Sequence, residues 1–253
     1  KYFFTKHIAL FFFFFLFSMK KYILGLMFVL VSCFAFAGDV AAFEDIGFSA
    51  DGKTYLFAEY GITDKDFQGY AEIYAVDIEK NDFVSGGVFK ATDKTGKTGK
   101  ELFSNLKDKS NSFLSKYNVK PITPDSVLYV RVAAAGPSTD MIVFKDFEHS
   151  TVDNPISYNV RLMPLYEGNG NSTQSSFYIV VERKDVDGKL LSRQVIGNPD
   201  IKRKGVIDYT IDQIFTTPDG KGIVFLVAKT ISNKSDISIR FMVETAKLNP
   251  IEK

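Results

Sequence analysis

Alternation of hydrophobic and polar side chains is the dominant pattern of the chain beyond residue 39. Apolar residues occupy every second position from Ile237 to Val243 and from Phe177 to Val181. A period of two is that of β-strands, whose successive side chains point to opposite faces. Further strands are expected at Thr54–Tyr60, Tyr70–Ile78, Phe83–Lys90, Val127–Ala134, Met141–Phe147, Tyr158–Leu165, Tyr209–Phe215 and Gly222–Lys229. Gly, Asn, Asp and Pro residues separate these runs, so the pattern predicts an all-β fold of antiparallel meanders.

One segment departs from this period. Between Thr98 and Tyr117 the apolar residues recur at helical spacing and form a single stripe. Thr98 and Glu101 have the spacing of a capping box, and Pro121 lies beyond the expected end. We therefore expect an amphipathic helix over residues 98–117 that packs on the sheet.

Residues 19–37 have the layout of a secretory signal peptide. Two lysines follow Met19, an apolar run extends from Tyr22 to Phe36, and small residues at Ala35 and Ala37 predict cleavage between Ala37 and Gly38. Residues 1–18 are expected to come from translation upstream of the native start. Residues 38–253 are expected to form a single β-rich domain, with a first strand unit at 43–90, the helix at 98–117 and the remaining strands at 126–247.

Cys33 offers a second processing route. Residues 30–33 fit a loose bacterial lipobox, in which the cysteine would become the lipidated first residue. The small residues at Ala35 and Ala37 favour the soluble product instead. We therefore expect a periplasmic or secreted protein, with a membrane-anchored lipoprotein as the alternative and contact with a membrane only through Cys33.

Composition and charge narrow the function classes. The chain has 253 residues, 45% hydrophobic and 24% charged, which is typical of a folded protein. Residues 1–38 hold four of the 31 basic side chains and none of the 30 acidic ones, so the exported part is slightly acidic and no nucleic-acid partner is expected. The single cysteine allows no disulfide within the chain.

Two segments share a turn motif. In residues 48–57 and 215–225 a strand ends, an Asp-Gly turn follows (Asp51-Gly52 and Asp219-Gly220), and a second strand carries a Phe six residues after the Asp. Gly takes the left-handed conformation of tight hairpins at no steric cost. The motif resembles the S-P-D-G-K blade signature of TolB-type β-propellers, which implies blade-like repeats and a binding role in the bacterial envelope. With two clear copies, a distorted β-sandwich stays open as the alternative architecture.

A wider resemblance covers residues 43–247. The residues that carry it are Asp45–Phe48, Gln68–Tyr74, Lys116-Tyr117 and Ile239–Thr245. In this order they are similar to a bacterial family known as predicted secreted proteins of unknown function. That resemblance implies export and no particular activity.

The sequence offers little material for known catalytic or metal sites. Gly96-Lys97-Thr98 lacks the first glycine of a phosphate-binding loop, because position 91 is Ala. Asp64, Asp66 and Gln68 resemble a calcium loop, but Ala75 stands where the bidentate Glu belongs. His149, the one histidine after the signal segment, has Asp146, Glu148 and Asp153 nearby and is interpreted as a surface-loop residue. No catalytic residue, metal site or cofactor is predicted.

Five aromatic residues gather near the first hairpin. We interpret them as cross-strand pairs of the core, with a recognition surface as the alternative. They are Tyr55, Tyr60, Phe67, Tyr70 and Tyr74.

The expected function is that of a non-enzymatic envelope protein whose loops or sheet edge contact another envelope protein, with no cofactor and no assigned oligomeric state. One alternative is a hydrolase of envelope polymers that acts through carboxylates among Asp45, Glu59, Glu72 and Asp77. A second alternative is a small-ligand carrier, which requires a deep and mainly apolar pocket.

Overall fold

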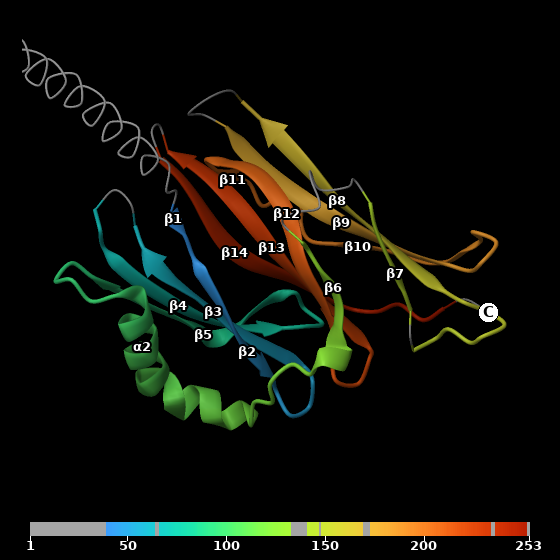
Figure 1. Cartoon of the computed structure of the whole chain (residues 1–253), viewed down its shortest axis with the longest axis horizontal. Helices are drawn as coiled ribbons and strands as arrows, with labels where there is room; N and C mark the ends of the chain where they lie inside the picture. The colour runs from blue at the N-terminus through green and yellow to red at the C-terminus, as the bar shows by residue number, and fades with distance from the viewer. Residues whose placement is uncertain are drawn as a thin grey trace, which may run out of the picture. The chain divides into compact units, whose positions relative to one another are not determined.

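Three β-sheets and one long helix hold most of the regular structure (Figure 1). The computed structural model describes residues 39–63, 66–132, 141–146, 148–168, 173–233 and 236–251. The strands are β1 (Asp39–Val40), β2 (Ala42–Phe48), β3 (Thr54–Ile62), β4 (Gly69–Asp77), β5 (Asp82–Asp93), β6 (Val127–Val130), β7 (Ile142–Lys145), β8 (Ser157–Glu167), β9 (Gln174–Lys184), β10 (Leu190–Ile196), β11 (Arg203–Lys204), β12 (Val206–Thr216), β13 (Gly222–Asn233) and β14 (Asp236–Lys247). The helices are α2 (Gly99–Leu114), η1 (Ser115–Tyr117) and η2 (Pro124–Ser126).

The strands pair in three sheets. The amino-terminal sheet has the order β2-β3-β4-β5, the central sheet β1-β14-β13-β12-β6, and the outer sheet β10-β9-β8-β7 with β11 also paired to β9. Neighbours are antiparallel except that β1 runs parallel to β14. The mostly antiparallel β fold expected from the alternation is therefore confirmed.

The sheets pack face to face in layers. Figure 1 shows α2 against the amino-terminal sheet, which lies on one side of the central sheet, while the outer sheet lies on the other side. Each interface is apolar. Leu106 of α2 packs against Ile73, Phe57 packs between the amino-terminal and central sheets, and Phe225 packs between the central and outer sheets. Because the central sheet is covered on both faces, the first half of its strand β13 is a continuous apolar run, and residues 223–228 are all buried.

The predicted elements are present, together with three strands that the sequence did not predict. Each expected strand overlaps an observed one, and the expected helix appears as α2 followed by η1. Thr98 and Glu101 form the predicted capping box, in which the Glu101 N–H donates to Thr98 Oγ1 at 3.2 Å and the Thr98 N–H donates to Glu101 Oε2 at 2.8 Å. The strand expected before the Asp51-Gly52 turn is β2, whereas β1, β10 and β11, which lack a clear apolar alternation, were not expected from the sequence.

The two Asp-Gly turns have the same internal hydrogen bonds. Asp51 Oδ1 accepts from the Ser49 hydroxyl at 2.6 Å and from the Lys53 N–H at 3.1 Å. Asp219 Oδ1 accepts from the equivalent Thr217 hydroxyl at 2.7 Å and Lys221 N–H at 3.1 Å. Gly52 and Gly220 have φ angles of 70° and 67°. The motif thus specifies one turn geometry twice, once in the amino-terminal sheet and once in the central sheet.

The propeller that the TolB-like motif implied is not confirmed. The likeness between the two copies is established only for the turns, whereas closed propellers are usually built from about four to eight repeated blades. The described strands form three sheets that differ in strand order and number.

The export signals fall outside the described residues, since Cys33, Ala37 and Gly38 all precede Asp39. Among the described residues, no helix has both the length and the hydrophobicity to cross a membrane.

Candidate functional site

A cavity of about 430 Å³ opens where three distant parts of the chain meet. Its volume lies within the usual range of ligand pockets, about 300 to 1,000 Å³. One part is η2 with the start of β6, another is the turn after β7, and the third is the β12–β13 hairpin. The lining residues are Pro124, Asp125, Val127, Leu128, Asp146, Glu148, Tyr158, Thr216 and Gly220.

Strand pairing brings these segments together. β6 adds to the edge of the central sheet by pairing with β12, where Tyr129 lies opposite Ile214. β7 adds to the edge of the outer sheet by pairing with β8, where Phe144 lies opposite Tyr158. The cavity therefore lies between the ends of two packed sheets, and its walls are fixed by backbone hydrogen bonds.

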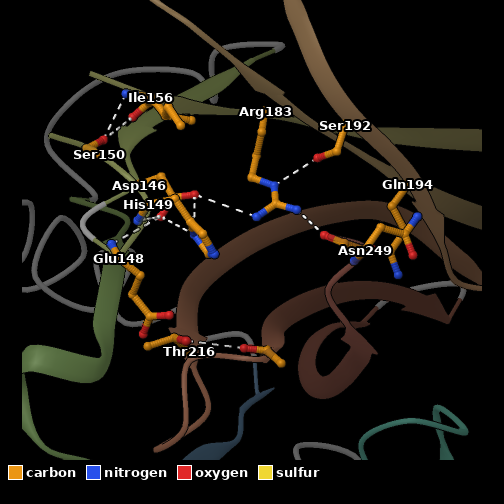
Figure 2. A network of polar contacts seen from close by, with 11 residues as sticks. Asp146, Glu148, His149, Ser150, Ile156, Arg183, Ser192, Gln194, Thr216 and Asn249 are labelled. Carbon is orange, nitrogen blue, oxygen red and sulfur yellow. Dashed lines mark hydrogen bonds and ion pairs between the residues drawn. The ribbon is translucent and has the colours of Figure 1, made fainter. Parts of the chain in front are cut away.

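Asp146 and Arg183 form a buried ion pair beside the cavity (Figure 2). Asp146 Oδ2 lies 3.7 Å from Arg183 Nη1, and 2% of the Asp146 side chain and 3% of the Arg183 side chain are exposed. Arg183 also donates to Ser192 Oγ at 2.8 Å and to the backbone carbonyl of Asn249. The guanidinium thus joins the turn after β7 to β10 and to the carboxyl-terminal segment.

Asp146 also shapes the turn that follows it. Its Oδ1 accepts hydrogen bonds from the backbone N–H groups of Glu148 and His149, at 3.2 and 3.1 Å. His149 Nδ1 lies 3.0 Å from both carboxylate oxygens, and 41% of the histidine side chain is exposed. His149 is therefore a surface-turn residue, as the sequence indicated, but its imidazole is oriented by a buried carboxylate.

Glu148 lies against the glycine of the second Asp-Gly turn. A side-chain carbon at Gly220 would come within 1.8 Å of Glu148 Oε2. Figure 2 shows Glu148 extending from the Asp146 turn toward Thr216, the last residue of β12 before the Asp219-Gly220 turn. Only a glycine at position 220 leaves room for the Glu148 carboxylate in this wall of the cavity.

Tyr158 contributes an aromatic surface. Its ring stacks on Phe144 with 4.9 Å between the ring centroids, and the Arg183 guanidinium carbon lies 5.8 Å from its centroid. Burial raises the pKa of the Tyr158 hydroxyl well above its usual value. The negative charges of Asp146 and Glu148 raise it further, while Arg183 opposes the shift. The hydroxyl therefore stays protonated at neutral pH.

The four carboxylates suggested for a hydrolase lie elsewhere, because none of them lines the cavity. Glu59 and Glu72 face each other across β3 and β4, but Glu59 accepts the Phe241 N–H at 2.7 Å and Glu72 pairs with Lys90 at 3.0 Å. Asp77 pairs with Lys80 at 3.1 Å at the end of β4, and Asp45 belongs to β2. Glu59, Glu72 and Asp77 are therefore each paired with another group of the fold.

The structure also locates the aromatic residues near the first hairpin and part of the calcium-like loop. Tyr55, Tyr70 and Tyr74 are buried, whereas Phe67 is 80% exposed. Asp64 lies outside the described residues, and Asp66 is exposed in a turn. Among the described residues, the His, Cys, Asp and Glu side chains form no group of three or more that could hold a metal ion.

Sequence reasoning missed Asp125, Tyr158, Arg183 and Thr216 as site residues. For Arg183 a signal existed: Phe177, Ile179 and Val181 point into the core, so the same alternation places a charged residue inward at position 183. An inward arginine requires a buried anion. The identity of that anion depends on the fold.

Comparison with known proteins identifies a family. The family model described as "Predicted secreted protein (DUF2259)" matches residues 56–247, and the chain belongs to this family. No curated protein and no solved structure matches the chain. The uncharacterised secreted family expected from the sequence is thereby established.

Proposed function

We propose that this chain, a member of that secreted family, is an exported, non-enzymatic binding protein whose cavity holds a group of another envelope protein. The supporting observation is the way in which the cavity is built. Three segments that are far apart in sequence meet there, and the buried Asp146–Arg183 pair fixes the turn that supplies one wall. A preformed concave site lowers the ordering cost of binding.

The polar groups of the site also favour binding over group transfer. Thr216, the one hydroxyl-bearing aliphatic side chain in the lining, directs its Oγ1 to the carbonyl oxygen of Gly222 at 3.3 Å. Asp146 is occupied by Arg183, His149 and two backbone N–H groups.

The test is site-specific photo-crosslinking in living cells. An apolar photoreactive amino acid replaces the exposed Pro124 at the cavity, so that the charged side chains of the lining stay in place, and the control replaces Asp108, which is exposed on α2. We expect one envelope protein to crosslink reproducibly from position 124 and not from position 108. Identical products from both positions, or none from position 124, would contradict a binding role for the cavity.

A hydrolase is the second candidate, because an exposed imidazole oriented by a buried carboxylate is the arrangement of a general base. The observation that favours it is the 3.0 Å contact of His149 Nδ1 with Asp146. Purified protein and its His149→Gln variant would be compared on chromogenic esters. Turnover by the unchanged protein that His149→Gln abolishes would support this candidate, and equal rates would remove it.

A further inference from the structure

The cavity has one acidic wall and one apolar wall. Asp125 and Glu148 supply carboxylates, while Pro124, Val127 and Leu128 supply apolar surface. A volume of about 430 Å³ is far larger than a single ion or water molecule occupies. The lining suits an organic group with an aliphatic stem and a charged end.

The charge balance favours a cation. Arg183 lies beside Asp146, so this buried carboxylate already has a positive partner. Within the described part of the chain, the carboxylates of Glu148 and Asp125 have neither an ion-pair nor a hydrogen-bond partner. Two carboxylates in the lining are therefore available to a positively charged group.

Tyr158 adds a neutral polar group to the cavity. Its side chain is 4% exposed, and it lines the cavity. Burial and the negative charges of Asp146 and Glu148 raise the pKa of its hydroxyl, whereas the charge of Arg183 and a hydrogen bond from Arg183 oppose the shift. The neutral hydroxyl can accept a hydrogen bond from an N–H donor of a bound cation.

We infer that the cavity binds the cationic end of a lysine or arginine side chain of the partner protein, with Glu148 and Asp125 as the anions and Pro124, Val127 and Leu128 against the aliphatic stem. This inference rests on the proposed function, because it names the chemical group that the partner presents. The stem of lysine or arginine is apolar and its end is charged, which matches the two walls.

The binding test uses small probes. Arginine and lysine, each acetylated at the α-nitrogen and amidated at the carboxyl end, represent the charged side chains. The same derivative of citrulline is the neutral counterpart of arginine, and putrescine represents a free polyamine. Binding is followed by nuclear magnetic resonance shifts of the exported form. We expect saturable shifts at Gly220 and Thr216 with the arginine or lysine probe. The citrulline probe should bind at least about tenfold more weakly than the arginine probe. Tighter binding of putrescine than of both amides would instead assign the site to a free polyamine and overturn the side-chain assignment.

The two Asp-Gly turns supply a matched pair of variants. Gly52→Ala and Gly220→Ala impose the same strained φ on alanine, 70° and 67°. At Gly52 the nearest atom to the new carbon is Pro218 Cδ at 3.7 Å, whereas at Gly220 the new carbon displaces the Glu148 carboxylate. We expect Gly220→Ala and Glu148→Gln to weaken cation binding about tenfold and Gly52→Ala to leave it unchanged. Equal affinity in Gly52→Ala and Gly220→Ala, or equal affinity for arginine and citrulline, would overturn the inference.

Failure of the inference is distinguishable from failure of the proposed function. If position 124 crosslinks one envelope protein while no cationic probe binds, the binding role stands and the cationic group is wrong. If the probes bind but position 124 captures no protein, the cation site stands without a protein partner and the side-chain assignment is overturned.

Discussion

The carboxylate of Asp146 and the guanidinium of Arg183 face each other inside the protein, with 3.7 Å between Oδ2 and Nη1. Removing one member of a buried pair leaves the other charge without compensation. We expect Arg183→Met to lower the free energy of unfolding by about 3–5 kcal/mol. Urea denaturation monitored by tyrosine fluorescence and circular dichroism would measure this change.

The protein contains its own control for this prediction. Arg193 Nε lies at the same 3.7 Å from Glu182 Oε1, but 59% of the Arg193 side chain is exposed. Exposed pairs contribute about 0–1 kcal/mol, because water screens them. Arg193→Met should therefore cost about 1 kcal/mol or less. If the two variants lost similar amounts of unfolding free energy, burial would not be what makes the Asp146–Arg183 pair important for stability.

Burial of the Glu59 carboxyl is expected to make the contribution of this residue to stability fall as the pH rises. Burial raises the pKa of this carboxyl, although the Phe241 N–H and the nearby Lys229 and Arg240 oppose the shift and Glu72 adds to it. The folded protein therefore binds more protons than the unfolded chain between the ordinary pKa of 4.5 and the raised value. In this window the contribution of Glu59 to stability falls as the pH rises.

Glu59→Gln removes this titration and keeps an oxygen that can accept the Phe241 N–H. The free energy of unfolding of the variant minus that of the unchanged protein should become more positive as the pH rises from 4.5 toward the raised pKa of Glu59. Urea denaturation at several pH values measures this difference. A difference that stays constant across the range would contradict the raised pKa.

Gly99 begins α2 where the helix rests on β3. A side-chain carbon at Gly99 would lie 2.5 Å from the backbone N and O atoms of Gly61. Alanine is normally favoured over glycine in helices by about 1 kcal/mol. Here we expect Gly99→Ala to destabilise the protein by about 1–3 kcal/mol, because neither backbone can move freely.

The neighbouring exposed Lys100 is the control for Gly99. Lys100→Ala should change the free energy of unfolding by less than about 0.5 kcal/mol. Thermal unfolding would compare the two variants. A higher melting temperature for Gly99→Ala would mean that helix propensity outweighs the close approach of the two glycines.

Thr98 caps the same helix. Its Oγ1 accepts the Glu101 N–H at 3.2 Å, so Thr98→Ala leaves that group without its cap. We expect a loss of about 1 kcal/mol for Thr98→Ala and little change for Thr98→Ser, which keeps the hydroxyl. Urea denaturation would measure both variants, and equal stability of the two would mean that the hydroxyl is not the stabilising group.

Local patterns determined the elements of this protein. Alternation located the long strands, the stripe from Leu102 to Leu114 located the helix, and the Asp-Gly dipeptides located two hairpins of the same geometry. These features depend on residues within one or two turns of chain. β1 and β10 could not be predicted from local patterns, because they are strands through their pairing with β14 and β9.

The sequence by itself therefore determined the class of fold, the capped helix and the turns, since each follows from short-range sterics and side-chain periodicity. Only the tertiary structure decided that the sheets stack in layers and that Asp146, 37 positions from Arg183, is its buried counterion. It also decided that Gly220 faces Glu148 and thereby belongs to a cavity. These relationships depend on which sheet edges meet, and that choice is made by packing of the whole core.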